Sequence, residues 1–256
     1  MGATISFTAL PGIGEVTAGT DLAAVVAESL LRAGMTLQPG DILVVAQKVV
    51  SKAEGRHVDL ATVTPSAQAL ELAAVTRKDP RLVQLVLDES SDVLRAVPNV
   101  LVVRHRCGFV MANAGIDRSN SGPRAAGQEI VVLLPREPDA SASGLREALR
   151  MRLGVAPGVI ISDSFGRPWR NGSVNVALGV AGLASLVDRR GEKDRDGRVL
   201  EATEVAYADA LAAGAGLVMG EGGEGTPMVL VRGWSVAASE HNGGALIRPL
   251  AEDLFQ

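Results

Sequence analysis

The stretch VLVVRHRCGFVMA, residues 100–112, decides the fold class of this sequence. It contains two mainly apolar runs, Val100–Arg104 and Phe109–Ala112, and the short polar segment between them is typical of two paired strands. A hairpin-like pair interrupts the regular alternation of strands and helices that a doubly wound parallel sheet requires. We therefore predict an α+β fold.

The remaining elements follow from apolar periodicity and from helix start and stop signals. We expect strands at Thr4–Leu10, Ile42–Val50, Glu129–Leu134, Gly158–Ser162 and Met228–Arg232. We expect helices at Asp21–Ala33 with Thr20 as N-cap and Gly34 as C-cap, at 64–75 with Pro65 as the first helical residue, at 79–86, at Ser143–Leu153 and at Glu204–Ala213. Residues 177–186 are apolar and contain glycine, and the sequence does not decide between helix and strand for them. The polar residues 135–142, with two prolines, mark the expected boundary between two subregions of one domain, residues 1–256.

The composition is that of an ordinary globular enzyme, with 47% apolar and 21% charged residues. Aromatic residues make up only 3%, so the core must consist of Val, Leu, Ile and Ala. The formal net charge of -4 leaves no basic surplus. We therefore expect neither a nucleic acid nor an anionic membrane as partner.

Cysteine usage and the N-terminus indicate a cytoplasmic protein. Cys107 is the only cysteine, so no internal disulfide can form, and we interpret it as a small core residue rather than a nucleophile. Residues 1–10 lack the pattern of a signal peptide. No apolar run reaches the roughly 20 residues that a membrane helix needs.

A basic segment, QKVVSKAEGR at residues 47–56, follows an apolar strand. Lysine and arginine side chains at the end of a strand can hold phosphate groups. The segment lacks the glycine-rich pattern of a P-loop, so a P-loop nucleotidase is unsupported. The simpler interpretation is a solvated loop after a buried strand.

Short polar side chains and glycines gather in ANAGIDRSNSG, residues 112–122. Asp117 offers a hard oxygen ligand of the kind that Mg²⁺ or Mn²⁺ binds. Asn120 can form hydrogen bonds with a base or a ribose. The alternative is an Asx-rich turn without a ligand.

The segment ISDSFGRPWRNG, residues 161–172, is interpreted as a loop at the end of a strand. Asp163 and Ser164 stand where metal-binding side chains are common. Arg167 and Arg170 can neutralise phosphate or carboxylate charge. Trp169 can line a pocket for a ring or belong to the core.

The segment GEGGEGTP, residues 220–227, brings four glycines close together. Backbone amides without side chains can approach phosphates closely, and Glu221 and Glu224 can hold a cation. A flexible exposed loop is an equally good explanation. The charged run 188–196 is interpreted as solvated, although its Lys193 can contact an anionic substrate. Together, these segments indicate a nucleotide and a metal.

The chain resembles the coenzyme F420-0:L-glutamate ligase family, which includes CofE in archaea and the N-terminal part of FbiB in actinobacteria. The resemblance runs from about Ala9 to Gly233 and rests on six ordered motifs. These are KVVSKAEGR (48–56), KDPRLVQLVLDES (78–90), GFVMANAGIDRSN (108–120), DSFGRPWRNG (163–172), TEVAYADALA (203–212) and VMGEGGEGTP (218–227).

This resemblance implies the activity and its cofactors. The expected reaction is GTP-dependent ligation of L-glutamate to F420-0, with further gamma-glutamyl additions, through an acyl phosphate in coenzyme F420 biosynthesis. It implies two divalent cations, Mn²⁺ or Mg²⁺, a potassium ion, a homodimer, and interlocked sheets flanked by helices. The chain after Gly233 shows no nitroreductase domain of the fused actinobacterial type.

Residue by residue, the resemblance places Asp117 and Asp163 at the first metal, and Ser164 and Glu221 at the second. Asp117, Asp163 and Lys52 are the expected catalytic residues. The expected GTP contacts are Gly14, Glu15, Val16, Gln47, Lys52, Asn120, Gly220, Glu221, Gly222, Gly223, Glu224, Gly225 and Thr226. Gln47 stands where we expect a small hydroxyl residue. Arg167, Trp169 and Arg170 are the expected substrate contacts.

Two alternatives remain open on the sequence. A ligase of the same fold can act on another carboxylic acid, such as a folate, because the motifs determine nucleotide and metal chemistry better than the acceptor. A nucleotide-binding relative without catalysis is the second alternative. The presence of Asp117, Asp163 and Ser164 argues against it.

Overall fold

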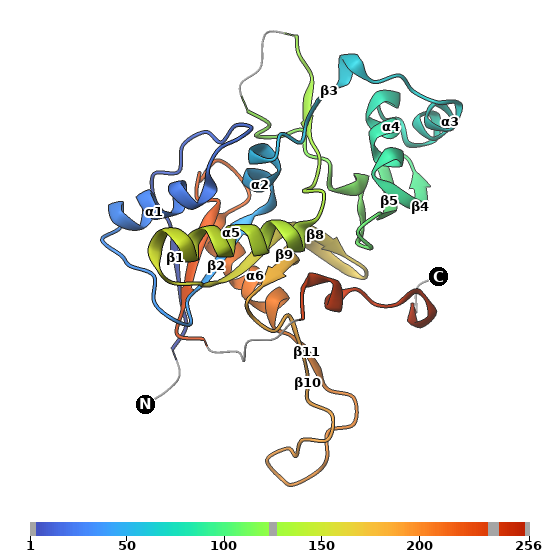
Figure 1. Ribbon diagram of the computed structural model, residues 1–256. Helices are drawn as coiled ribbons and strands as arrows, with labels where there is room; N and C mark the ends of the chain where they lie inside the picture. The colour runs from blue at the N-terminus through green and yellow to red at the C-terminus, as the bar shows by residue number, and fades with distance from the viewer. Residues whose placement is uncertain (1–3, 123–126, 235–240, 254–256) are drawn as a thin grey trace.

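The computed structural model describes residues 4–122, 127–234 and 241–253 (Figure 1). Its helices are α1 (Leu22–Arg32), α2 (Gln47–Ala53), α3 (Ala67–Thr76), α4 (Pro80–Asp88), α5 (Pro138–Leu153) and α6 (Tyr207–Met219). Its strands are β1 (Ser6–Ala9), β2 (Ile42–Ala46), β3 (His57–Asp59), β4 (Ser90–Val97), β5 (Val100–His105), β6 (Val110–Ala112), β7 (Ile130–Val132), β8 (Gly158–Arg167), β9 (Arg170–Ala181), β10 (Leu186–Asp188), β11 (Glu204–Ala206) and β12 (Met228–Arg232).

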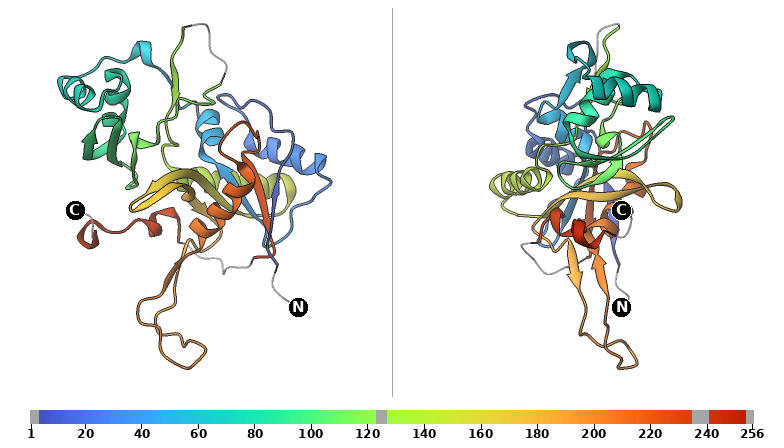
Figure 2. Two further views of the ribbon diagram at one scale, coloured as in Figure 1. Left: turned by 180° about the vertical axis from the view of Figure 1, so that it is seen from behind. Right: turned by 90° about the vertical axis from the view of Figure 1, so that its right-hand side faces the viewer.

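A five-stranded sheet in the order β1-β12-β2-β8-β9 forms the centre of the molecule. Strands β2 and β8 run parallel, and the other neighbours run antiparallel. Helices α1 and α5 cover one face and α6 covers the other, as the front and back views show (Figures 1 and 2). Mixed sheets with helices confirm the predicted α+β class.

Burial alternates along the central strands between the two faces. Leu43 and Val45 of β2 pack toward α1 and α5, whereas Ile42 and Val44 pack toward α6. Because both faces are covered, the strand is apolar throughout, as expected for a sheet buried on both sides. Each fully buried Leu or Ile side chain contributes about 1.5–3 kcal/mol relative to an exposed one.

A smaller part lies beside the central sheet (Figure 2). It contains the sheet β4-β5-β6, on which α3 and α4 pack through residues such as Val83, Val86 and Leu101. The antiparallel pairing of β5 with β6 confirms the predicted strand pair at 100–112. The chain leaves the central part after α2 and returns through β7, whose residues pair with β3.

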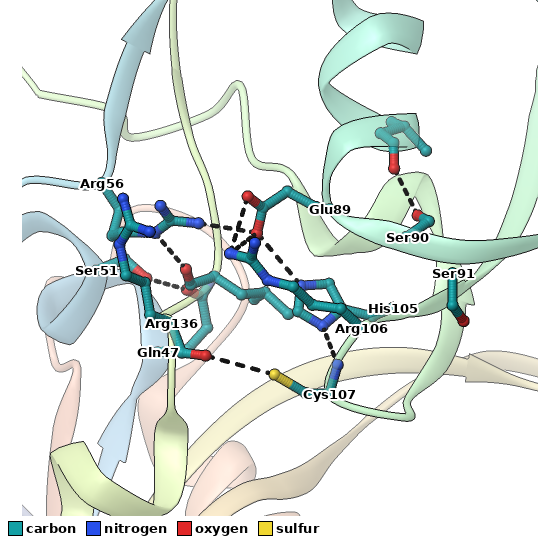
Figure 3. Close-up of polar contacts among 12 residues, drawn as sticks. Gln47, Ser51, Arg56, Glu89, Ser90, Ser91, His105, Arg106, Cys107 and Arg136 are labelled. Atoms are coloured by element: carbon teal, nitrogen blue, oxygen red, sulfur yellow. Dashed lines mark hydrogen bonds and ion pairs between the residues drawn. The ribbon is translucent and has the colours of Figure 1, made fainter.

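A buried cluster of charges joins the smaller part to the central one (Figure 3). The Glu89 carboxylate accepts hydrogen bonds from Arg56 at 2.8 Å and from Arg106 at 2.8 and 3.0 Å. Arg56 Nε also donates to the Leu134 carbonyl at 2.8 Å. Burial raises the pKa of Glu89, but the hydrogen bond from His105 and the Arg56 contacts outweigh it, so the pKa lies below its usual value. The cluster therefore fixes the end of α2 against the smaller part.

Two expected element types are wrong. The strand predicted to reach Val50 ends at Ala46, where α2 begins. The apolar residues Val49 and Val50 suggested that the strand continued. In the structure the Ser51 hydroxyl donates to the side chain of Gln47, four residues earlier, and this spacing is that of one helical turn. The segment 161–172 is not a loop: it contains the second part of β8, the turn of the hairpin and the first residues of β9.

Several boundaries also differ from expectation. Asp21, not Thr20, caps α1, because its carboxylate accepts from the amide of Ala24. Ser66 caps α3, so Pro65 precedes the helix. Residues 138–142, expected as connection, form the first turns of α5, and residues 204–206, expected as helix, form β11. The open segment 177–186 is strand up to Ala181.

The strands β10 and β11 form a hairpin that projects from the body (Figure 1). Its long tip carries the charged run 188–198, which is exposed as predicted. Over the described ranges, no helix combines the length and the apolar character needed to cross a bilayer.

Candidate functional site

Four chain segments meet at one edge of the central sheet. Strands β1 and β2 both end there, the first leading into residues 10–16 and the second into α2. The parallel pairing of β8 with β2 stops at Ser162, and β8 continues past it with Asp163 and Ser164. The loop 220–227 arrives from α6 and leads into β12, which begins at this edge.

A cavity of about 680 Å³ lies between these segments. A fifth segment, residues 117–122, closes it from the side of the smaller part. Every predicted GTP or metal residue lines this cavity: Gly14, Glu15, Val16, Gln47, Lys52, Asp117, Asn120, Asp163, Ser164 and residues 220–226. The predicted GTP and metal residues are therefore brought together from five separate parts of the chain.

Helix α2 supplies the basic side chains of the cavity. Lys52 is largely buried, and its Nζ lies 2.6 Å from the Oε1 atom of Glu15, which is half exposed. Lys48 Nζ lies 3.3 Å from Asp117 Oδ2 and 3.5 Å from Ser119 Oγ. Both ammonium groups are thus held inside the cavity by carboxylates, in positions from which they can contact an anionic ligand.

Asp117 is positioned by β7. Its backbone amide and carbonyl both bond to Val132, at 2.9 Å each. Gln47 Nε2 donates to Asp117 Oδ2 at 2.9 Å. Burial raises the pKa of the Asp117 carboxyl group, and the nearby charge of Lys48 partly opposes this rise.

Asp163 is the more strongly perturbed of the two aspartates. Burial, followed by the negative charge of Asp117, raises the pKa of Asp163 to about 7. Glu221 raises the pKa values of both aspartates further. The buried Asp117 and Asp163 carboxyl groups, with the charge of Glu221 nearby, therefore resist ionisation, which is the condition that a bound cation would relieve.

The donor set fits a hard divalent cation that keeps part of its coordination for other oxygens. Among the described residues, no three His, Cys, Asp or Glu side chains are spaced as a complete metal site. Mg²⁺ is commonly held by one or two carboxylates together with phosphate oxygens and water. Asp117 and Asp163 match this arrangement. The Ser162 hydroxyl, which precedes Asp163 on β8, is buried and has no hydrogen-bond partner in the part of the chain that the structure describes.

The glycine-rich loop keeps its shape through its own side chains. Thr226 donates to the carbonyl groups of Val218 and Met219 at the end of α6. The amide of Gly222 donates to Glu224 at 2.8 Å, and Asn120 donates to the Gly222 carbonyl at 3.5 Å. The loop is therefore connected to the opposite wall of the cavity.

Some predicted residues lie elsewhere. Arg167, Trp169 and Arg170 form the turn of the β8–β9 hairpin and do not line the cavity. Trp169 is 90% exposed, so it is not a core residue. Lys193 lies between β10 and β11, in the tip of their hairpin, and does not line the cavity. The assignment of these residues to substrate stays a prediction.

Cys107 is not a core residue, contrary to expectation, because it is only partly buried. Its Sγ donates to the Arg136 carbonyl at 3.5 Å (Figure 3). Burial raises the pKa of the thiol, which keeps it protonated and disfavours a nucleophilic role.

Sequence reasoning missed some lining residues. Lys48 belonged to the basic segment that was expected to hold phosphate groups, but it was not selected as a site residue, although its charge lies next to Asp117. Asn175 lines the cavity because it faces Ser164 across the hairpin, a pairing that no local pattern indicates. Ser119 belonged to a quoted motif, and its neighbour Asn120 was the residue selected.

Comparison with known proteins gives a consistent result. Residues 12–233 match the family model described as F420-0:Gamma-glutamyl ligase. The chain is 45% identical to the protein named Coenzyme F420:L-glutamate ligase of Methanothermobacter thermautotrophicus, over 98% of this chain and 99% of the relative. The proteins of the same name are 43% identical in Methanopyrus kandleri, over 99% and 98% of the two chains, and 48% identical in Halobacterium salinarum, over 88% and 85%.

Proposed function

The chain belongs to the F420-0:gamma-glutamyl ligase family, and from this premise we propose that it uses GTP and divalent cations to join L-glutamate to coenzyme F420-0. One observation carries the proposal for the nucleotide and the cations. The predicted nucleotide and metal residues, which come from five separate segments, line a single cavity.

The nucleotide would lie between α2 and the glycine-rich loop. Lys52 is the principal cation for its phosphates, since its ammonium group is buried and needs only to exchange Glu15 for a phosphate oxygen. The glycines of the loop 220–226 carry no side chain that would keep a phosphate away from the backbone, and the Gly222 amide would exchange Glu224 for a phosphate oxygen. Asn120, which also lines the cavity, would contact the ribose or the base.

Asp117 and Asp163 would hold the divalent cation, with Ser164 and Glu221 beside a second one. Such cations spread the charge of the transferring phosphoryl group over its oxygens. The protein's own contribution is to hold both carboxylates in a buried space and to keep Lys48 and Lys52 nearby as fixed positive charges. No residue is assigned to the potassium ion.

The proposed reaction has two steps. A carboxylate oxygen of F420-0 attacks the γ-phosphorus of GTP, which forms an acyl phosphate and releases GDP. The amine of L-glutamate then attacks the acyl carbon, an amide bond forms, and inorganic phosphate leaves with one oxygen of the original carboxylate. The amine must lose a proton, and a general base for this step is not assigned.

The finer features of the proposal concern assembly and location. We propose a homodimer and a cytoplasmic enzyme. A sedimentation experiment that gives the mass of a single chain at micromolar concentration would exclude the dimer.

The two-step reaction has a direct isotopic test. F420-0 labelled with ¹⁸O in the acceptor carboxylate is incubated with L-glutamate, GTP and Mn²⁺, and the released phosphate is analysed by mass spectrometry. We expect one ¹⁸O atom in each phosphate for every amide formed. Amide formation with unlabelled phosphate would refute the acyl phosphate.

A further inference from the structure

We propose that Ser51 and Gln47 are positioning residues that orient the Asp117 carboxylate for ligation, with Ser51 acting through Gln47. The inference deepens the proposed function and rests on it. It assigns a role to a buried hydroxyl group that does not line the cavity, and it gives Gln47 a role toward the protein itself.

The two residues lie one turn apart on α2 and are both buried. Ser51 is 0% exposed and Gln47 is 1% exposed. The Ser51 hydroxyl donates to Gln47 Oε1 at 2.9 Å, and both residues are labelled in Figure 3. At its other end, the same amide donates through Nε2 to Asp117 Oδ2 at 2.9 Å.

This arrangement determines which end of the amide faces Asp117. A glutamine amide has an oxygen that accepts and a nitrogen that donates, and the surrounding hydrogen bonds decide which is which. The ionised Asp117 carboxylate only accepts, so the nitrogen must face it, and the Ser51 hydroxyl donates to the oxygen left at the other end. The reversed amide would place its oxygen against the negative charge of Asp117.

The contact also selects one oxygen of Asp117. Within the described part of the chain, the side-chain contacts from Gln47 and Lys48 both fall on Oδ2. Oδ1 takes part in neither of these contacts and would be the oxygen available to a ligand in the cavity. Outer residues that orient a metal-binding carboxylate commonly change metal affinity or activity by about 10- to 100-fold when they are removed.

The test is a double-mutant cycle on the ligation rate. Ser51→Ala removes the hydroxyl group, Gln47→Met removes both hydrogen bonds at similar size, and the third variant combines the two changes. Rates of glutamyl addition are measured at saturating F420-0, L-glutamate and GTP over a series of Mn²⁺ concentrations. Mn²⁺ binding to the same proteins is measured by electron paramagnetic resonance in the presence of GDP.

Ser185→Ala is the matched control. Ser185 is also fully buried and donates to a backbone carbonyl, that of Asn242, at 2.6 Å, but it does not line the cavity. Its loss removes a comparable buried hydrogen bond without touching Asp117. It therefore reports the effect of lost stability alone.

We expect Ser51→Ala to lower kcat about tenfold or more and to weaken Mn²⁺ binding, and Ser185→Ala to change neither. In the Gln47→Met background, Ser51→Ala should cost nothing further, because Ser51 acts through Gln47. The inference would be overturned if the two substitutions lowered kcat independently, so that their effects multiplied in the double variant. It would also be overturned if Ser51→Ala and Ser185→Ala lowered kcat to the same extent. If the wild-type rate does not depend on the Mn²⁺ concentration, the role of the metal in the proposed function is refuted. The double-mutant cycle on kcat still tests the role of Ser51 in that case.

Discussion

Replacing Asp163 with asparagine should stabilise the metal-free protein while it abolishes ligation. Asp163 has a pKa of about 7 in the folded protein, against 3.8 for an unperturbed aspartate. The folded state therefore binds the proton more tightly than the unfolded state. The sign follows from linkage: stability is greatest below the unfolded pKa and falls as the pH rises through the folded pKa.

The magnitude follows from the same two pKa values. Each tenfold difference in proton affinity corresponds to about 1.4 kcal/mol, so ionised Asp163 costs the folded protein about 4 kcal/mol at pH 8. At pH 5 the cost is only about 1.7 kcal/mol, because the folded protein keeps the carboxyl group protonated there. The stability advantage of Asp163→Asn should therefore grow by about 2.5 kcal/mol between pH 5 and pH 8.

Urea denaturation of wild type and variant at both pH values, with EDTA present, measures this difference. Comparing two pH values cancels any effect of the amide that does not depend on pH. Asp196→Asn, on the exposed tip of the projecting hairpin, is the control and should show no such growth. An advantage that stays constant between pH 5 and pH 8 would refute the argument that Asp163 is buried near other negative charges.

Three further variants have defined outcomes. Glu89→Gln should lower the free energy of unfolding by about 3–5 kcal/mol in urea at pH 7, because it leaves buried Arg56 without its counter-charge. Since the pKa of Glu89 lies below its usual value, the wild type should keep this advantage at neutral pH and lose it only as the carboxyl group takes up a proton in acid; an advantage that does not shrink on acidification would contradict the account. Lys52→Met should weaken GTP binding about 10- to 100-fold in a fluorescent-nucleotide titration, and unchanged binding would remove Lys52 from the phosphate site. Gly220→Ala should destabilise the protein by about 1–3 kcal/mol, since the residue has a φ of 72° and an added Cβ would overlap the Glu224 side chain; an unshifted thermal transition would contradict this.

The sequence predicted those parts of the fold that depend on local patterns. The helix expected next to Asp79-Pro80 is α4, which begins at Pro80, and the bounds of β12, Met228–Arg232, agree with the structure. The hairpin of β8 and β9 was missed because Gly166, Pro168 and Gly172 have the composition of a loop. Its long strands depend on pairing across the sheet, which local composition does not contain.

The individual residues of the candidate site were also selected from local patterns, but their meeting in one cavity was not. Asp163 was selected because it follows an apolar strand, and Asp117 because it stands among short polar residues. Neither pattern indicates that the two carboxylates face the same cavity, since β7 positions one and β8 the other. The Ser51–Gln47 contact was missed because the segment was expected to be a strand. Side chains four residues apart are neighbours on a helix but lie far apart along a strand.

The central claim is that this cavity ligates L-glutamate to F420-0 at the expense of GTP. The most direct test is mass spectrometry of F420-0 incubated with L-glutamate, GTP and Mn²⁺, for the wild type and for Asp117→Ala. The account predicts a product heavier by one or more glutamyl units with the wild type, none without GTP, and none with the variant. No heavier product from the folded wild type, or full activity of Asp117→Ala, would contradict it.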